Sequence, residues 1–339
     1  MKKLRVLVLM HPSLVPPENL EGYSEKEIYV WKTEYDVVRT LRELGHEARP
    51  LGVQDELLPI RTVVTEWRPH VVFNLLEEFH GMAEFDQHVV SLLELLRVPY
   101  TGCNPRGLVL ARDKGLSKKL AVYHRIRTPG FVVFRRGAAV RPRRGVSYPA
   151  IVKSLTEHAS LGISQASVVD GEEKMTERVK FIHERIGTDA IVEQFIEGRE
   201  LYVGILGNRQ VKVLPTWELV FDNLARGSAA IATARAKHNP EYQEKRGIYQ
   251  QPADGLPEGL AEHVARTSKR IFRILELDGY ARIDYRLSTS GHLYFLEANP
   301  NPEIAAREEF ASAAQEYGLG YPQLLQKILD LGLRRGRSH

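Results

Sequence analysis

The sequence of 339 residues has almost no cysteine and no long hydrophobic run. Its one cysteine, Cys103, excludes an internal disulfide bond and favours a reducing compartment. The apolar run from Leu4 to Met10 is too short to cross a membrane and lacks a signal-peptide cleavage pattern. We therefore expect a cytoplasmic protein that does not contact a membrane, with this run as a buried strand.

Net charge and repeats are also scarce. A formal net charge of +4 is small for this length and gives little support for a polyanionic partner, and we find no internal repeat or low-complexity segment. The arginine-rich segment from Arg135 to Arg144 could contact nucleic acid, but it lacks the interleaved aromatic residues of a stacking surface. We favour a solvated loop between strands and regard a nucleic-acid partner as the weaker interpretation.

The first hundred residues alternate strand-like and helix-like segments. A helix from Glu27 to Leu44, stopped by Gly45, follows the first strand, and a buried strand at 71–75 is followed by a second helix. This order predicts a parallel sheet with helices on both faces. Ligands of such sheets lie at the carboxyl ends of the strands, here His11–Val15 and Asn74–His80.

The most informative segment reads GYARIDYRLSTSGHLYFLEANPNP and predicts two antiparallel strands joined by a turn. We centre the turn on Thr289-Ser290. Arg282 then lies opposite Glu297. In the same register Asp284 lies opposite Phe295.

Four polar side chains of this hairpin are expected on one face, namely Arg282, Asp284, Glu297 and Asn299. Two carboxylates and an amide oxygen are hard ligands that suit Mg²⁺, which proteins hold with one or two carboxylates plus substrate phosphates. The structural alternative is an exposed hairpin with a cross-strand Arg282–Glu297 ion pair worth ~0.2–1 kcal/mol.

Two other segments carry weaker signals for nucleotide binding. The strand that ends at Lys153 leads into a loop of small polar residues, where backbone N–H groups and Ser160 can contact phosphates. This loop lacks the glycine spacing of a Walker motif. The connector EQFIEGRE, residues 193–200, could bind adenine through its backbone and ribose through its carboxylates, or it is an ordinary linker.

The order of these segments resembles the ATP-grasp superfamily, and within it the D-alanine–D-alanine ligase-like carboxylate–amine ligases. The motifs that carry the resemblance are, in chain order, VVFNLLEEFHG, VPYTG, ARDK, PAIVK, SLGIS, IVEQFIEGREL, ARIDYR and LEANPNP. The resemblance implies a three-domain fold of the α/β and α+β classes, with ATP between the last two domains. We expect a parallel α/β domain over 1–104, a small central domain over 105–195 and a larger α+β domain over 196–339.

The resemblance also implies roles for individual residues. The expected ATP contacts are Lys114, Lys153 and Ser160 at the phosphates, Glu193, Phe195, Ile196 and Leu296 at adenine, and Glu200 at the ribose. The expected ligands of two Mg²⁺ ions, for which Mn²⁺ could substitute, are Asp284, Glu297 and Asn299. Arg282 would stabilise the acyl phosphate and the tetrahedral intermediate, and Lys237, on a closing loop over 226–239, would reach the transferred phosphate.

Three substrate-side positions depart from the family pattern. His11–Asn19 stands where the family has a glycine-rich turn with a glutamate that fixes the first amino acid. His158 and Ala159-Ser160 replace a glycine and paired serines in the phosphate loop. Glu303 replaces a glycine whose backbone helps to hold the oxyanion. The ATP half is therefore preserved and the amino-acid half is rewritten.

We therefore expect an ATP- and Mg²⁺-dependent ligase that forms an amide bond between a small-molecule carboxylate and an amine, at least one of them an amino acid or a similar metabolite. D-alanine–D-alanine ligase itself is the alternative within this class. Two alternatives come from other classes: an ATP-binding regulatory module without ligase activity, and a nucleic-acid-binding protein that uses the arginine-rich segment and the tail at 333–337. The sequence leaves open both substrates, the pathway, the role of Glu303 and the oligomeric state, for which a homodimer is one option.

Overall fold

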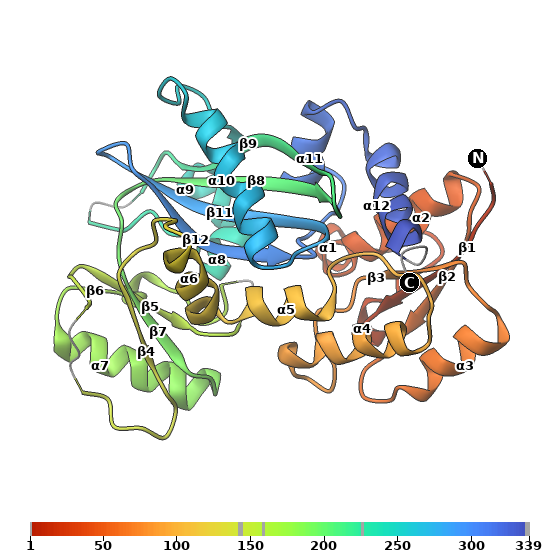
Figure 1. Ribbon diagram of the computed structural model, residues 1–339, viewed down its shortest axis with the longest axis horizontal. Coiled ribbons are helices and arrows are strands. Elements are labelled where there is room, and N and C mark those ends of the chain that lie inside the picture. Colours follow the sequence, from red (N-terminus) through yellow and green to blue (C-terminus); the bar gives the residue numbers. More distant parts are fainter. Residues whose placement is uncertain (1, 142–144, 158–159, 225–226, 336–339) are drawn as a thin grey trace.

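The computed structural model describes residues 2–141, 145–157, 160–224 and 227–335. Within them the chain forms three sheets that follow one another along the sequence (Figure 1). Their strand orders are β2-β1-β3, β4-β7-β5-β6 and β10-β9-β8-β11-β12. The first sheet is parallel and the other two are antiparallel, which confirms the expected mixture of α/β and α+β architecture.

The first sheet contains two strands that are buried on both faces, as predicted. Its strands are β1 (Arg5–Met10), β2 (Glu47–Gly52) and β3 (Val71–Asn74). Alternate residues of β1 belong to two hydrophobic clusters, with Leu7 and Leu9 in one and Val6 and Val8 in the other. We did not predict β2, because its sequence EARPLG has charged residues and a proline instead of an apolar run.

The helices of this region are α1 (Glu25–Val30), α2 (Lys32–Glu43), α3 (Leu58–Glu66) and α4 (Asp86–Leu95). The prediction of one helix over 27–44 is wrong, because the chain breaks at Trp31, whose φ is −121°. The Trp31 ring packs edge-on against Tyr23 and tilts over Tyr35, which stabilises the break. The predicted stop at Gly45 is confirmed, with φ at 84°.

The connection to the second sheet consists of α5 (Pro105–Arg112) and α6 (Lys114–Tyr123). The prediction of one helix over 107–124 is also wrong. Asp113 is extended, with ψ at 99°, and its carboxylate accepts from the Leu116 N–H at 2.8 Å. An aspartate in this role starts a new helix and aims the first turn of α6.

The second sheet is formed by β4 (Phe131–Phe134), β5 (Ala150–Ser154), β6 (Val168–Val169) and β7 (Ala190–Gln194) and is covered by α7 (Glu172–Phe181). A π-helical turn at Ile182–Ile186 follows α7. The arginine-rich segment runs between β4 and β5, as predicted, and Arg135 forms an ion pair with Asp189 at 2.6 Å. Arg143 and Arg144 lie outside the described residues.

The third sheet holds β8 (Gly198–Gly207), β9 (Val211–Phe221), β10 (Ile248–Pro252), β11 (Gly279–Ser288) and β12 (Leu293–Pro300). The helices of this region are α8 (Ala234–His238), α9 (Pro240–Arg246), α10 (Leu260–Ile274), α11 (Glu309–Glu316) and α12 (Tyr321–Arg335). Phe272 of α10 packs on the sheet in one cluster with Ile283. The last helix, α12, returns to the first sheet, where Ile328 shares a cluster with Val8 (Figure 1).

Among the described residues, no helix combines the length and the apolar character that crossing a bilayer requires.

Candidate active site

The β11–β12 hairpin forms as predicted, but its register differs from the prediction. Arg282 pairs with Asn299, and Asp284 pairs with Glu297. The predicted pairs of Arg282 with Glu297 and of Asp284 with Phe295 are therefore wrong. The four polar side chains nevertheless alternate onto one face, because the true register differs by an even number of residues.

A one-residue bulge in β12 produces this register. Asp284 pairs with Glu297, but the next residue, Tyr285, pairs with Phe295, which leaves Leu296 as an extra residue. Without the bulge, Leu296 would lie opposite Asp284, and Glu297 would face the other side of the sheet. The bulge thus returns the carboxylate of Glu297 to the polar face.

Arg282 is held in place by three neighbours, Asp284, Glu309 and Tyr202. Its Nε and Nη2 donate to the two carboxylate oxygens of Asp284, at 2.7 and 2.9 Å. Its Nη1 donates to Glu309 at 3.3 Å, and the guanidinium lies 4.6 Å from the centre of the Tyr202 ring. Asn299 Nδ2 also donates to Asp284, at 3.0 Å. Such a clamp fixes the direction in which the arginine presents its charge.

The same face has more negative charge than Arg282 compensates. Burial raises the pKa of Asp284, and Glu297 raises it further, while Arg282 opposes both. Burial also raises the pKa of Glu309 to about 7, and its Oε1 has no hydrogen-bond partner. An added cation would relieve this excess.

The oxygen atoms on this face suit an Mg²⁺ ion whose coordination a bound ligand completes, and they do not suit a metal that protein side chains hold alone. Among the described residues, no group of three or more His, Cys, Asp or Glu side chains is arranged to hold a metal ion. A metal between Asp284 and Glu297 must therefore take further oxygens from the Asn299 amide and from a ligand. Two carboxylates completed by substrate oxygens is the usual composition of an Mg²⁺ site.

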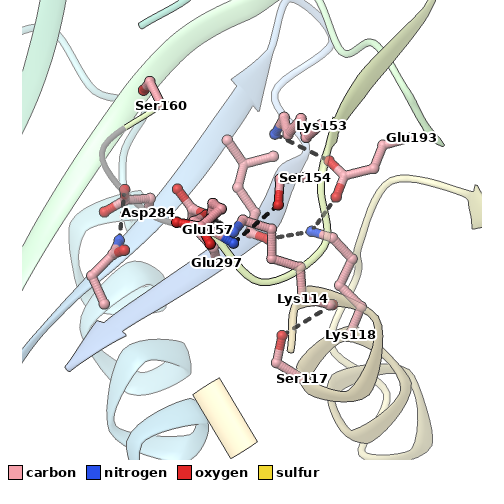
Figure 2. A network of polar contacts seen from close by, with 12 residues as sticks. Lys114, Ser117, Lys118, Lys153, Ser154, Glu157, Ser160, Glu193, Asp284 and Glu297 are labelled. Carbon is pink, nitrogen blue, oxygen red and sulfur yellow. Dashed lines mark hydrogen bonds and ion pairs between the residues drawn. The ribbon is translucent and has the colours of Figure 1, made fainter. Parts of the chain in front are cut away.

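A buried network of lysines faces this hairpin from the second sheet (Figure 2). Glu193 on β7 forms ion pairs with Lys118 at 3.3 Å and with Lys153 at 3.2 Å. Lys118 also donates to the backbone oxygen of Leu296, in the bulge of β12. Burial opposes ionisation of Glu193, but the two lysines outweigh it and lower its pKa.

Lys118 was not predicted. It lies one helical turn after Lys114 on α6 and is fully buried. The spacing of four residues places both lysines on one face of the helix, and this was the available signal. The spacing alone does not show that the second lysine is buried, because its partner Glu193 comes from a strand far along the chain.

One small cavity brings together four of the predicted residues: Lys114, Lys153, Ser160 and Glu297. Lys114 Nζ donates to the backbone oxygen of Glu157 at 2.6 Å and lies 3.6 Å from Glu297 Oε2. The cavity measures about 30 Å³. That volume suits roughly one water molecule and is smaller than a triphosphate.

The predicted ribose acid, Glu200 on β8, is almost fully buried and already paired. Arg286 lies 3.0 Å from its Oε2, and the Tyr202 hydroxyl donates to its Oε1 at 2.9 Å. Arg286 was not predicted as a site residue, although it alternates onto the same face of β11 as Asp284. It also lies 5.6 Å from the centre of the Phe195 ring, in the predicted adenine connector.

The predicted closing loop contacts the phosphate loop. Ser160 Oγ donates to the Ala232 backbone oxygen at 2.6 Å, and Arg286 donates to the Ala230 backbone oxygen at 3.0 Å. Lys237, on α8, is close enough to Asp284 and Glu309 to favour their ionised forms. Arg226 in this loop and His158 and Ala159 in the phosphate loop lie outside the described residues.

On the substrate side, the structure does not place Glu18 where the missing family glutamate would be. Glu18 is exposed and forms an ion pair with Arg42 at 2.9 Å on the surface. Glu303, after β12, is exposed and accepts from the Thr33 hydroxyl at 3.3 Å. Cys103 is buried, and burial raises the pKa of its thiol although Arg335 opposes the shift, so it does not have the lowered pKa of a nucleophilic thiol.

Comparisons with known proteins agree with this geometry. A family model described as "D-ala D-ala ligase C-terminus" matches residues 120–330. An uncharacterized protein of Sinorhizobium fredii, y4sG, is 34% identical over 88% of this chain and 87% of its own length. The D-alanine–D-alanine ligase of Aquifex aeolicus is 30% identical over 90% of this chain and 96% of its own.

Solved structures share the fold. The D-alanine–D-alanine ligase from Bacillus anthracis, in complex with ATP, superposes with a TM-score of 0.75 at 21% identity and covers 99% of both chains. The ligase from Coxiella burnetii superposes with a TM-score of 0.73 at 18% identity, covering 100% of this chain and 96% of its own. At these identities the superpositions establish the three-sheet arrangement and leave individual roles to the geometry.

Proposed function

This chain belongs to the D-alanine–D-alanine ligase family of ATP-dependent C–N ligases, and we propose that it activates a small carboxylate as an acyl phosphate and transfers the acyl group to an amine. The observation that carries the proposal is the cavity lined by Lys114, Lys153, Ser160 and Glu297. Lys114 at the start of α6, Lys153 of the second sheet and the Ser160 hydroxyl face the Glu297 carboxylate of the third sheet. This arrangement suits a triphosphate whose far end meets a metal.

In this proposal Asp284, Glu297 and Asn299 hold Mg²⁺. When bound, Mg²⁺ supplies positive charge that neutralises the β- and γ-phosphate oxygens. The raised pKa of the buried Asp284 beside Glu297 supports the assignment, because a bound cation relieves that repulsion.

The nucleotide base and ribose are assigned to the connector between β7 and β8. We propose that the backbone of Phe195 and Ile196 and the side chain of Leu296 contact adenine, and that Glu200 accepts from the ribose. Glu193 retains its place near adenine in this scheme, but its buried carboxylate chiefly orients Lys118 and Lys153. The nucleotide then lies between the proposed domains 105–195 and 196–339, with 1–104 covering the substrate end.

Catalysis depends on positioning and charge, as in other phosphoryl transfers. The substrate carboxylate attacks the γ-phosphorus and ADP leaves; an amine then attacks the acyl carbon and phosphate leaves. Arg282, fixed by Asp284 and Glu309, stabilises the charge that develops on the acyl oxygens. Lys237 approaches the transferred phosphate from the closing loop.

We further propose that D-alanyl-D-alanine is not the main product. A pocket for D-alanine needs an acid after β1 for its ammonium group and a small residue near the oxyanion. Glu18 is instead paired with Arg42 on the surface, and Glu303 occupies the glycine position. A cytoplasmic location belongs to the same proposal, supported by the free thiol of Cys103.

The test is an ADP-release screen over pairs of carboxylates and amines, with product masses. We expect the best pair to exceed D-alanine alone by about tenfold or more. Equal turnover with D-alanine alone, together with the mass of the dipeptide, would identify the chain as a D-alanine–D-alanine ligase. Nucleotide binding without ADP release for any pair would favour a regulatory module instead.

A further inference from the structure

A second cavity, of about 840 Å³, lies where distant segments of the chain meet. Its lining comes from the turn between β8 and β9 with its flanking residues, from the carboxyl-terminal ends of α10 and α12, and from Asn104 at the start of α5. None of the lining residues takes part in the proposed nucleotide, metal or substrate contacts. Pockets for small molecules usually measure ~300–1,000 Å³, so this cavity can hold one.

The lining of this cavity is strongly basic. Against two carboxylates it presents six cationic side chains, which together with the cavity we call the basic groove: Arg209, Lys212, Arg273, Lys327, Arg334 and Arg335. Both carboxylates are already engaged. Glu276 forms an ion pair with Arg106 at 2.7 Å. Asp278 forms one with Arg335 at 2.6 Å. The positive charge of the groove therefore exceeds what its own acids balance.

Three of the six cations have no partner in the part of the chain that the structure describes. The side chains of Arg209, Arg273 and Lys327 form no hydrogen bond or ion pair with another described residue. Lys327 is the most informative of the three, because it is half-buried. A lysine that is partly withdrawn from water and unpaired is stabilised by an anion that binds next to it.

Helix dipoles explain only part of this charge. Arg273 lies in the last turn of α10 and Arg335 in the last turn of α12, where the negative end of the helix dipole favours cations. Arg209 and Lys212 instead belong to the β8–β9 turn and the start of β9, and Lys327 lies in the middle of α12. Their presence in the same cavity has no such local cause, and a bound anion supplies one.

Hydrogen bonds between the segments fix the walls of the groove. Asn208, in the β8–β9 turn, donates to the Leu331 backbone oxygen of α12 at 3.1 Å and accepts from the Gly279 N–H of β11 at 3.1 Å. The Asn104 side chain donates to the Glu276 backbone oxygen at 2.7 Å. The groove is therefore formed before a ligand binds, which lowers the conformational cost of binding.

We propose that the basic groove binds a small polyanion, namely a metabolite with two or more phosphate or carboxylate groups. Arginine side chains bind both groups through paired N–H donors. The apolar residues Leu206, Val211 and Leu277 in the lining suit the carbon skeleton of such a molecule. Among the described residues no aromatic side chain lines the groove, so it lacks the stacking surface that single-stranded nucleic acid uses.

The test is calorimetric titration of the full chain in Mg²⁺-free buffer with tripolyphosphate and with citrate. Inorganic phosphate and acetate are the matching controls with a single acid group. We expect at least one polyanion to bind about tenfold or more tightly than its control, and the tighter of the two identifies the preferred acid group. The groove variant Arg273→Gln/Lys327→Gln should lose about tenfold in that affinity.

The matched control variant is Lys180→Gln/Arg185→Gln, at exposed positions on and after α7. It removes the same charge and should bind the polyanion as the unmodified chain does. Lys153→Met, in the proposed phosphate site, should also leave this affinity unchanged. If thermal unfolding shows that the groove variant is misfolded, Arg209→Gln alone, in an exposed turn, decides the matter with an expected loss of about threefold.

Equal polyanion affinity in the groove variant and its matched control would overturn the inference, and so would the lack of any preference for a polyanion over its single-group control. A loss of affinity in Lys153→Met alone would assign the polyanion to the phosphate site instead. Tighter binding of oligothymidylate or of phosphatidylglycerol vesicles than of either polyanion, lost in the groove variant, would assign the groove to a nucleic acid or a membrane. The inference does not depend on the ligase function, which ADP release tests separately.

Discussion

The nucleotide side and the substrate side of this molecule treat buried charge in opposite ways. On the nucleotide side the buried acids have cations of the chain within ion-pair distance: Glu193 pairs with two lysines, Glu200 with Arg286, and Asp284 and Glu309 share Arg282. On the substrate side, Glu34 on α2 and Glu77 after β3 form no ion pair among the described residues, and desolvation raises the pKa of each to about 7. A site whose charges are balanced by the chain is stable before its ligand arrives, whereas an unbalanced site depends on its ligand for the missing charge.

Glu297→Gln should cause the largest loss on the nucleotide side. It removes a charge from the proposed Mg²⁺ ligands and weakens the contact with Lys114. We expect ADP release at saturating Mg²⁺ and ATP to fall on the order of 10³-fold with the fold intact, and Asn299→Ala to behave similarly. Glu262→Gln, on the exposed face of α10, is the matched control. Near-normal ADP release in Glu297→Gln would remove this residue from the metal site.

Lys118→Met tests whether the nucleotide side is balanced as the ion pairs indicate. The change leaves the buried Glu193 with Lys153 as its one cation. Removal of one partner of a buried ion pair should lower the free energy of unfolding by about 3 kcal/mol. Adding Glu193→Gln should restore part of that loss, because no buried carboxylate is then left short of charge. Denaturant unfolding measures both, and a double variant less stable than Lys118→Met would contradict the balance.

How far the sequence predicts this site depends on how local each feature is. The shared face of Asp284 and Glu297 followed from strand alternation, but the bulge at Leu296 did not, because a backbone insertion leaves no apolar pattern. The break at Asp113 could have been predicted, since aspartate is a common helix cap. The burial of Glu34 near Glu77 and Glu303 could not have been predicted, because tertiary packing alone brings these residues close enough to raise its pKa.

Removal of the Lys237 charge should lower turnover less than Glu297→Gln does. The predicted closing loop accepts a hydrogen bond from Ser160 at the Ala232 backbone oxygen, and Lys237 favours the ionised form of Asp284, a proposed metal ligand. We expect Lys237→Met to lower kcat about 10²-fold while ATP affinity changes by about threefold or less. Lys153→Met should instead weaken ATP binding itself. Equal losses of ATP affinity in the two variants, measured by titration with a non-hydrolysable analogue, would argue against a closing loop.

Glu34→Gln should have the smallest effect and the opposite sign, because it removes an unbalanced charge. The folded-state pKa of Glu34 is raised from 4.5 to about 7, so the stability linked to its protonated form is complete below about pH 4.5 and is lost as the pH rises through 7. One pKa unit corresponds to about 1.4 kcal/mol, and a buried amide also costs free energy. We therefore expect the variant to be more stable than the unmodified chain by about 2 kcal/mol near pH 8 and equal to it near pH 4.

Urea unfolding of both proteins at the two pH values measures the difference, with the exposed Glu172→Gln as a control that should show none. Equal stability of the two proteins near pH 8 would mean that the chain already balances Glu34. The contrast in charge balance between the nucleotide side and the substrate side would then not hold for Glu34, the residue that supports it most.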